Sequence, residues 1–171
     1  ACRLYGKNIE AIIVASSDKS YGSYPQDKMP YKEDYPLNPM FPYDTSKACT
    51  DLIAKSYSTS YKNMPIIITR FCNIYGPGQL NFSAIIPDSI RSAIGYSNFI
   101  PRGDGKSIRD FIYVEDVCEL YQVIALNLAN NKKLSGEIFN AGTNKPISIR
   151  DVVVNIFTLI GAEKELKKIL L

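Results

Sequence analysis

A tyrosine and a lysine four residues apart, Tyr43 and Lys47, are the most informative pair of chemical groups in the sequence. In a helix this spacing places both side chains on one face. A tyrosine hydroxyl with its ordinary pKa of about 10 is a poor base at neutral pH, but a neighbouring ammonium stabilises the phenolate and lowers that pKa. The pair could therefore remove a proton from an alcohol while a hydride leaves the carbon. An exposed tyrosine and a solvated lysine at the start of a helix are the simpler alternative.

Two apolar runs flank this pair and predict the sheet that positions it. Residues 11–15 and 66–69 are rich in β-branched side chains without alternation, which is typical of buried parallel strands. A polar loop over 22–42 and a helix over about 44–62 separate them. This order is that of a βαβ unit with a right-handed crossover, so we expect the two strands to be parallel.

The helix predicted over 44–62 has Asp44 and Thr45 as candidate caps. Its apolar residues form an approximate stripe, which is the pattern of a helix with one buried face. The stripe consists of Ala48, Leu52, Ile53, Tyr57 and Tyr61.

Polar groups follow both strands at the point where each one ends. Ser16, Ser17 and Asp18 come after the first strand, and Asn73 comes after the second. In open α/β sheets, ligands bind at the carboxyl ends of the strands. A hydroxyl at Ser17 could therefore hydrogen-bond the substrate oxygen that Tyr43 deprotonates, although serine is also common in simple turns.

After the glycine turn at 76–78, the apolar runs of the sequence become shorter and are more often interrupted by polar residues. The patterns there indicate short elements, and Ser148 is a candidate helix cap. We expect helices over 84–94, 115–129 and 148–160, and strands over 99–102, 110–114 and 137–141.

The composition is that of an ordinary soluble globular protein, with 46% hydrophobic and 22% charged residues. A net charge of +3 without a basic stripe gives no support to a nucleic-acid partner. Apolar runs such as 66–68 are too short to span a membrane, and the amino terminus has no signal-peptide pattern.

Four cysteines occur without a C-x-x-C pair and without any histidine, so the sequence predicts no metal site. They are Cys2, Cys49, Cys72 and Cys118. Their apolar or helical surroundings indicate reduced, small core residues, which favours a cytoplasmic protein.

Six short motifs follow one another along the chain. They are S-S-x-x-x-Y-G (16–22), P-Y-x-x-S-K (42–47), R-F-x-N-x-Y-G-P-G (70–78), I-P (86–87), G-D-G-x-x-x-R-D-F-I-Y-V-x-D-V (103–117) and F-N-A-G (139–142). Together they resemble the extended short-chain dehydrogenase/reductases that act on nucleotide sugars, the NAD-dependent epimerases and dehydratases. Each motif is weak alone, but the set is specific and covers nearly the whole chain.

The resemblance implies an α/β fold, consisting of the carboxy-terminal part of a Rossmann-like doubly wound parallel sheet plus a smaller α/β substrate domain. Residues 1–78 would be the second half of the NAD-binding domain and would contain the catalytic residues. Residues 79–171 would be mainly the substrate-binding domain, with some segments returning to the first domain.

The resemblance also implies a role for each matching residue. Tyr43 would be the catalytic base, and Lys47 would be its partner and would hold the nicotinamide ribose of NAD, the implied cofactor. Ser17 would share the substrate hydroxyl. The nicotinamide pocket would be lined by Ser16 and by the backbone of Phe71 and Cys72.

The implied substrate is a nucleotide-diphosphate sugar. Asn73 and Arg109 would contact its diphosphate, and Asn81 would also reach the substrate. A guanidinium fits a phosphate bidentately, which agrees with this role for Arg109. The alternative role of Arg109 is a surface ion pair with Asp104 or Asp110.

Asp18 and Lys19, directly after Ser17, bear on the reaction type. An epimerase and a 4,6-dehydratase both begin by moving hydride from C4 of the sugar to NAD, but the dehydratase also needs an acid for the C6 oxygen and a base for the C5 proton. Asp18 could be the acid if burial raises its pKa, and Lys19 could be the base if its pKa is depressed. Alternatively, Lys19 contacts a phosphate or lies on the surface.

The best-known sugar dehydratases have Glu in place of Lys19. The Ser-Asp-Lys sequence and residues 85–91 resemble CDP-glucose 4,6-dehydratases, whereas residues 109–114 have the form common in epimerases. We favour a nucleotide-sugar 4,6-dehydratase, which converts NDP-glucose to NDP-4-keto-6-deoxyglucose. A nucleotide-sugar 4-epimerase is the alternative, and a non-catalytic scaffold relative is the second alternative.

A dinucleotide-binding fold should open with a strand, a glycine-rich turn and a helix. The glycines at 76–78 and 103–105 lack the spacing and position of that motif. We therefore expect an amino-terminal part to be missing, and we expect the 171 residues alone to bind NAD poorly and to catalyse little or nothing. The family usually dimerises through the Tyr–Lys helix and a preceding helix, so the full-length form is a candidate homodimer.

Overall fold

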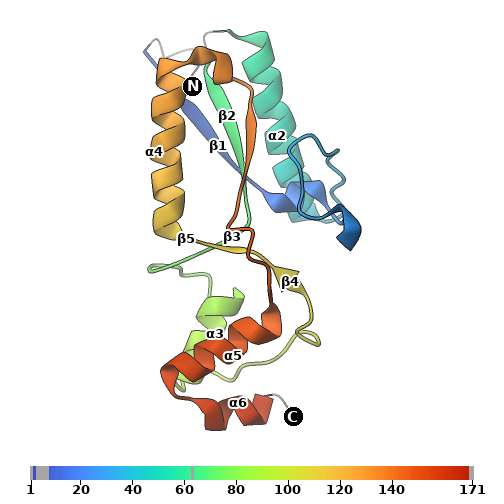
Figure 1. Ribbon diagram of the computed structural model, residues 1–171, viewed down its shortest axis with the longest axis vertical. Helices are drawn as coiled ribbons and strands as arrows, with labels where there is room; N and C mark the ends of the chain where they lie inside the picture. Colours follow the sequence, from blue (N-terminus) through green and yellow to red (C-terminus); the bar gives the residue numbers. More distant parts are fainter. Residues whose placement is uncertain (1, 3–7, 63, 170–171) are drawn as a thin grey trace.

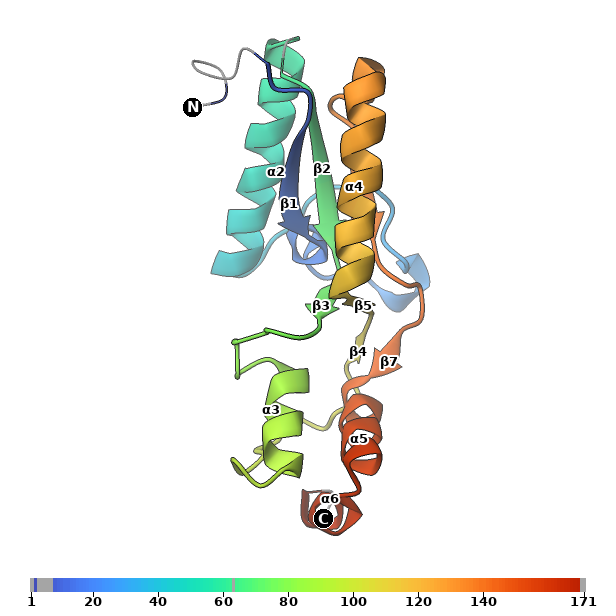
Figure 2. The ribbon, with the colours of Figure 1, turned by 90° about the vertical axis from the view of Figure 1, so that its left-hand side faces the viewer.

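The computed structural model describes residues 2, 8–62 and 64–169. A parallel sheet lies at the centre of one end of the molecule, with strands in the spatial order β1-β2-β6 (Figure 1). Helix α2 covers one face of this sheet and α4 covers the other (Figure 2). We call this part the sheet lobe. Its elements are β1 (Ile12–Ser17), η1 (Asp18–Tyr21), η2 (Gln26–Lys28), α2 (Pro42–Ser60), β2 (Ile66–Phe71), α4 (Val114–Asn130), η3 (Lys132–Leu134) and β6 (Ile138–Ala141).

The opposite end of the molecule, which we call the helical lobe, is built from three helices and a small antiparallel strand pair. Its elements are α3 (Ile85–Ala93), β4 (Ile108–Arg109), β7 (Ile147–Ser148), α5 (Ile149–Ile160) and α6 (Glu163–Ile169). Between the lobes, β3 (Asn73–Tyr75) pairs in parallel with β5 (Phe111–Tyr113). Figure 2 shows this pair at the junction of the two lobes.

Strand β2 is the centre of the sheet, and all six of its residues are buried. Ile66 and Ile68 belong to an apolar cluster with Ala54 of α2. Ile67 belongs to a different cluster with Leu128 of α4. A strand covered on both faces needs apolar residues at successive positions, which explains why this run shows no alternation.

The charged residue in this buried strand is Arg70, whose side chain is only 3% exposed. Its Nε donates to Oδ2 of Asp51 on α2 at 2.5 Å, and one of its terminal nitrogens donates to the hydroxyl of Tyr21 at 2.6 Å. The other carboxylate oxygen of Asp51, Oδ1, is buried and has no hydrogen-bond partner within the described residues. The charge of Arg70 is therefore the main compensation for burying Asp51.

Tyr21 extends this network to the opposite edge of the sheet. Its hydroxyl donates to Oδ1 of Asn140 on β6 at 2.7 Å, and its ring stacks on that of Tyr31 with 4.7 Å between centroids. Burial raises the pKa of Tyr21, despite the opposing effect of Arg70, so this hydroxyl remains a donor at neutral pH. The polar loop over 22–42 is thereby attached to the strand ends.

The predicted βαβ unit is confirmed, since β1 and β2 are parallel and joined through α2. Helix α2 begins at Pro42 with Phe41 as its N-cap and without a side-chain cap, so the expected capping by Asp44 or Thr45 is wrong. Proline suits the first helical position because the amide it lacks would have had no partner there. The expected cap by Ser148 on α5 is confirmed, because its side chain accepts from the amide of Asp151.

The apolar stripe expected to form the buried face of α2 is largely wrong. Its buried residues are Asp44, Ala48, Asp51 and Ala54. Leu52 and Ile53 are instead 64% and 59% exposed. The ion pair with Arg70 explains the difference, because it turns the acidic side of the helix toward the sheet.

Other expectations also require correction. Residues 99–102 are not a strand, and α6 was not predicted. The cysteines are free, as expected, but Cys2, Cys49 and Cys118 are exposed and are not core residues. Cys49 and Cys118 lie on the outer sides of α2 and α4. No helix among the described residues has both the length and the apolar character needed to span a membrane.

Replacing Asp51 with Ala is expected to lower the free energy of unfolding by about 3–5 kcal/mol, because Arg70 would remain buried without its partner. Urea denaturation of the whole protein measures this loss. Asp104→Ala is the control, since Asp104 pairs with Lys106 at 3.9 Å with side chains that are 68% and 84% exposed. That change should cost less than about 1 kcal/mol. Equal losses for the two variants would show that the buried pair does not stabilise the sheet lobe.

Candidate active site

A cavity of about 500 Å³ lies at the carboxyl ends of β1 and β2, between the sheet lobe and α3. It brings together every residue predicted for the site except Arg109. The predicted residues that line it are Ser16, Ser17, Asp18, Lys19, Tyr43, Lys47, Phe71, Cys72, Asn73 and Asn81. We call this space the strand-end cavity.

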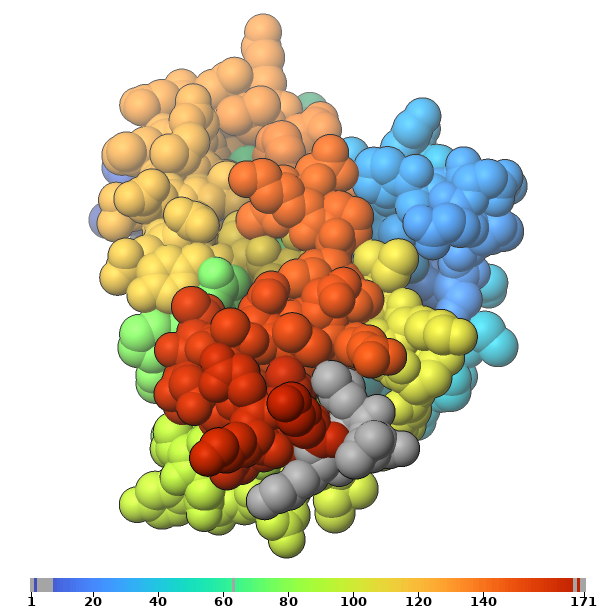
Figure 3. Space-filling model, turned by 60° about the horizontal axis from the view of Figure 1, so that its bottom comes forward, coloured from blue at the N-terminus to red at the C-terminus, as the bar shows by residue number. Residues whose placement is uncertain are grey.

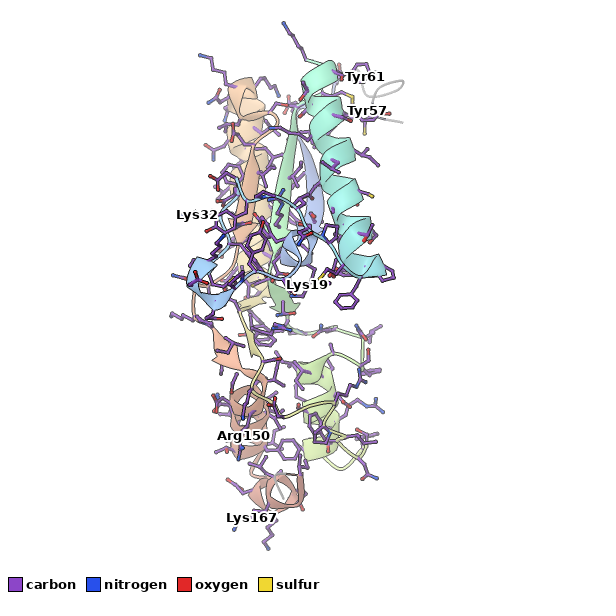
Figure 4. The ribbon with its side chains drawn as sticks, turned by 90° about the vertical axis from the view of Figure 1, so that its right-hand side faces the viewer. Lys19, Lys32, Tyr57, Tyr61, Arg150 and Lys167 are labelled. Carbon is purple, nitrogen blue, oxygen red and sulfur yellow. The ribbon has the colours of Figure 1, made fainter. Side chains whose placement is uncertain are left out.

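Ser17, Asp18 and Lys19 form a connected group where β1 passes into η1. The hydroxyl of Ser17 donates to Oδ1 of Asp18 at 3.2 Å and accepts from the amide of Lys19 at 3.3 Å. The ammonium of Lys19 lies 3.4 Å from the carboxylate of Asp18, with side chains that are 37% and 23% exposed. A hydroxyl, a carboxylate and an ammonium are thus presented side by side to the cavity. Figure 4 shows Lys19 at the end of the sheet that faces the helical lobe.

Tyr43 and Lys47 occupy the first turns of α2, as their spacing predicted. The Lys47 Nζ atom lies 5.9 Å from the centroid of the Tyr43 ring and donates to the carbonyl of Ala15 on β1 at 3.3 Å. This bond attaches the helix to the strand that ends in Ser16 and Ser17. Tyr43 is 56% exposed and lines the cavity, so its hydroxyl is accessible to a ligand.

The far wall of the cavity comes from the end of β2 and the start of β3. Asn73 donates through Nδ2 to the carbonyl of Asp110 at 3.0 Å. Burial, together with the nearby charge of Asp110, raises the pKa of the Cys72 thiol to about 12. At neutral pH Cys72 is therefore a thiol and not a nucleophilic thiolate, so it can line the cavity without competing in the chemistry.

Arg109 lies elsewhere, in a groove of about 450 Å³ within the helical lobe. Ile85 lines both this groove and the strand-end cavity, so the two spaces are neighbours. The expected alternative of an ion pair with Asp104 or Asp110 is wrong for the described residues. Asp104 pairs with Lys106, and the carboxylate of Asp110 accepts from backbone amides and a threonine.

Sequence reasoning did not identify several residues that line the two spaces. In the groove they include Arg102 and Arg150, which join Arg109 and give it three guanidinium groups beside two carboxylates, Asp88 and Asp104. Figure 4 shows Arg150 on α5 in the helical lobe. In the cavity they include Tyr75, Gln79, Ile85, Ile86, Phe111 and Tyr121. The position of Gln79 directly after the G-P-G turn was the available signal for one of them.

The strand-end cavity has the groups needed to surround the nicotinamide end of a dinucleotide. Ser16, Phe71 and Cys72 line it beside Tyr43 and Lys47. Among the described residues, however, no strand passes through a glycine-rich turn directly into a helix, which is the arrangement that binds a dinucleotide pyrophosphate. These residues therefore fit one end of NAD and supply no cradle for its pyrophosphate.

Comparison with known proteins agrees with this geometry. The human dTDP-D-glucose 4,6-dehydratase (Homo sapiens) is 34% identical over 152 residues, which are 89% of this chain and 41% of that protein. The structure of dTDP-glucose 4,6-dehydratase from Bacillus anthracis in complex with NAD superposes with a TM-score of 0.77 at 35% identity, over 87% of this chain and 45% of that one. These matches confirm the predicted Rossmann-like α/β fold.

An epimerase is also similar. The structure of UDP-N-acetylglucosamine 4-epimerase from Methanobrevibacter ruminantium has a TM-score of 0.74 at 28% identity, over 95% of this chain and 50% of that one. The chain spans about half the length, or less, of these relatives. The family model described as "NAD dependent epimerase/dehydratase family" matches residues 1–142, a range that contains both strand ends and the Tyr–Lys helix. The chain therefore belongs to the NAD-dependent epimerase/dehydratase family.

Proposed function

We propose that the whole protein is an NAD-dependent nucleotide-sugar 4,6-dehydratase that converts NDP-glucose to NDP-4-keto-6-deoxyglucose. One observation carries this proposal. An acid–base pair, Asp18 and Lys19, lines the same cavity as Ser17, Tyr43 and Lys47. Similarity to dTDP-glucose 4,6-dehydratases supports it. We also propose that the sheet lobe and the helical lobe correspond to the NAD-binding and substrate-binding domains.

In the first step Tyr43 takes the proton of the sugar's C4 hydroxyl, while Ser17 hydrogen-bonds the same oxygen. The Lys47 ammonium, 5.9 Å from the tyrosine ring, supplies positive charge where negative charge develops as that proton leaves. NAD, when bound, accepts the hydride from C4 and returns it at the end of the reaction. The product of this step is a 4-keto sugar, whose carbonyl makes the C5 proton acidic.

In the second step water is lost across C5 and C6. Because the two groups lie 3.4 Å apart, a proton passes from the ammonium of Lys19 to the carboxylate of Asp18. Lys19 then removes the C5 proton, and Asp18 protonates the departing C6 oxygen. The C5–H and C6–O bonds break and a C5=C6 double bond forms. The returned hydride then adds to C6 and a proton adds to C5. The side chains of Lys19 and Asp18 lie next to the hydroxyl of Ser17, which supports these roles.

The two neighbouring spaces suit the two ends of such a substrate. The sugar would lie in the strand-end cavity near Asn73 and Asn81, and the nucleotide end would lie in the groove. The guanidinium of Arg109 would bind the diphosphate, because a planar fork of N–H donors matches phosphate oxygens. Arg102 and Arg150 line the same groove and add positive charge for the anionic substrate.

A nucleotide-sugar 4-epimerase is the second candidate function. The similarity to a UDP-N-acetylglucosamine 4-epimerase favours it, and so does the segment over 109–114, whose form resembles that common in epimerases. An epimerase needs only the first step, followed by rotation of the sugar and return of the hydride to C4. Ser17, Tyr43 and Lys47 suffice for that chemistry, and Asp18 and Lys19 would then only contact the substrate.

Mass analysis of the product distinguishes the two reactions. The whole protein, incubated with NAD and nucleotide-activated glucoses, is expected to form a 4-keto product lighter by one water. The 4-keto group is detected by its absorbance in base. Isomerisation without a change of mass would instead establish the epimerase, and no reaction with any substrate would support a non-catalytic scaffold.

Tyr43→Phe removes the proposed base while preserving the ring. It is expected to lower kcat by about 10²–10⁴, the usual contribution of general base catalysis, with little effect on the unfolding temperature. Tyr57→Phe is the matched control, because Tyr57 is on the same helix, is 40% exposed and lies outside the cavity. Retention of turnover by the Tyr43 variant would place the base on another residue.

Asp18→Asn tests the second step separately from the first. The variant can still transfer hydride from C4 but cannot protonate the C6 oxygen, so reduced cofactor should accumulate while water loss slows by about 10² or more. The exposed Asp27 in η2 offers a control, Asp27→Asn, that should leave both rates unchanged. Unimpaired water loss in the Asp18 variant would remove this residue from the mechanism.

A further inference from the structure

Asp110, the residue between β4 and β5, accepts hydrogen bonds from backbone amides at both of its carboxylate oxygens. Its Oδ1 accepts from the amide of Phe111 at 2.9 Å and from the hydroxyl of Thr143. Its Oδ2 accepts from the amides of Thr143 at 2.8 Å and Asn144 at 3.0 Å. Its carbonyl accepts from the amide of Asn73 at 3.2 Å and from Nδ2 of the same residue at 3.0 Å.

These bonds join segments that each connect the two lobes. Asn73 begins β3, after which the chain enters α3, and Asp110 itself lies between β4 and β5. Thr143 and Asn144 belong to the segment that runs from β6 to β7 and on to α5. In Figure 3 this segment, coloured orange-red, lies beside the yellow segment that contains β4. Through its hydrogen bonds, Asp110 thus joins three interlobe segments that are distant from one another in the sequence.

The fit around Asp110 leaves little space. A Cβ atom on Gly142 would lie 2.5 Å from Oδ2 of Asp110, so glycine is required for this approach. Asn144 adopts a φ of 55°, in the left-handed region, which turns its amide toward the same oxygen. The backbone after β6 is therefore shaped to the carboxylate.

The lobes need such a fixed junction because they do not share a buried apolar cluster among the described residues. The clusters around Ile68 and Ile67 lie in the sheet lobe, and the cluster around Phe71 extends from that lobe to Ile112 of the junction strand β5. The cluster around Phe157 lies in the helical lobe with α3, α5 and α6. The relative orientation of the lobes consequently depends on the bonds at their junction.

The neighbours of Asp110 line different spaces. Phe111 and Asn73 line the strand-end cavity, whereas Arg109 lines the groove of the helical lobe. The segment held by Asp110 continues into β7, where Ile147 pairs with Arg109. A shift of this junction would therefore move the groove relative to the cavity.

We propose that Asp110 is a positioning residue that holds the strand-end cavity and the groove in register for one ligand that occupies both. The inference rests on the proposed function, in which a nucleotide sugar is that ligand. A ligand held at two sites gains affinity only when both can be engaged at once. If this arrangement is lost, the affinity for a ligand that occupies both spaces should fall far more than the affinity for a ligand that occupies the groove alone.

Asp110→Asn in the whole protein tests this consequence. The side chain of asparagine has nearly the same volume as that of aspartate, but it has one acceptor oxygen in place of two. Its NH₂ group would face backbone N–H donors, so some hydrogen bonds of the junction would be lost. We expect the affinity for the nucleotide sugar to fall by about tenfold or more, while the affinity for the free nucleoside diphosphate changes by less than about threefold. Isothermal titration calorimetry measures both. Equal losses for the two ligands, as a purely structural role would give, contradict the proposal.

Companion variants keep the test valid if Asp110→Asn does not fold. Thr143→Val removes a single hydrogen bond to the carboxylate and should reproduce part of the selective loss, whereas Thr143→Ser should retain the wild-type ratio of affinities. Asp116→Asn is the control, since Asp116 is exposed in the first turn of α4. A Thr143→Val protein with the wild-type ratio would also contradict the proposal.

A distance measurement tests the junction independently of substrate. Spin labels are placed by Leu126→Cys on α4 and Leu159→Cys on α5, which are 65% and 86% exposed, after the four native cysteines are replaced. Pulsed electron paramagnetic resonance should show one narrow interlobe distance, and Asp110→Asn should broaden or shift it. An unchanged distribution overturns the inference. If the unmutated protein binds no nucleotide sugar, the proposed function fails, whereas the distance still decides whether Asp110 positions the lobes.

Discussion

Arg70 carries a full positive charge into a strand that is covered on both faces, and the surrounding elements are arranged to compensate it. Removing an ion from water costs several kcal/mol unless a partner and hydrogen bonds replace the lost solvent. The partners of Arg70 come from outside the sheet, namely Asp51 on α2, Tyr21 at the end of η1, and the carbonyl of Glu33 in the loop over 22–42. A single guanidinium thereby fixes one helix, one turn and one loop against the strand ends.

This compensation also determines how α2 presents its chemical groups. Tyr43, Lys47 and Asp51 follow one another at intervals of four, so they lie along the same side of the helix. Asp51 fixes the rotation of the helix about its axis, and with that rotation Lys47 reaches the carbonyl of Ala15. The Tyr–Lys pair is consequently held at the strand-end cavity with the help of the Arg70–Asp51 ion pair, which takes no part in the proposed chemistry.

The sequence allowed the sheet strands β1, β2 and β6, the βαβ order and the polar residues at the strand ends of the cavity to be predicted, because these depend on local apolar runs and on where such runs end. The buried face of α2 could not be predicted in this way. Asp51 counts as a polar residue in any periodic pattern, and its partner Arg70 lies nineteen positions further along the chain. Likewise, Arg109 and Asn73 were assigned to one diphosphate site. Their separation into neighbouring spaces depends on β4 and β7, two-residue strands that are too short to have a periodic signal.

In the proposed function, the groups that carry out the chemistry line the strand-end cavity, and the groups that bind the nucleotide line the groove. The hydrogen bonds of the junction around Asp110 keep these two spaces in a fixed arrangement. The hydrophobic effect is non-directional, so by itself it favours no particular angle between two lobes. Hydrogen bonds depend strongly on angle as well as distance, so a junction made of them resists rotation. The bonds around Asp110 are of this second kind. If the proposed function holds, a substitution in the groove would therefore leave Ser17, Tyr43 and Lys47 in place, provided that the junction itself is retained.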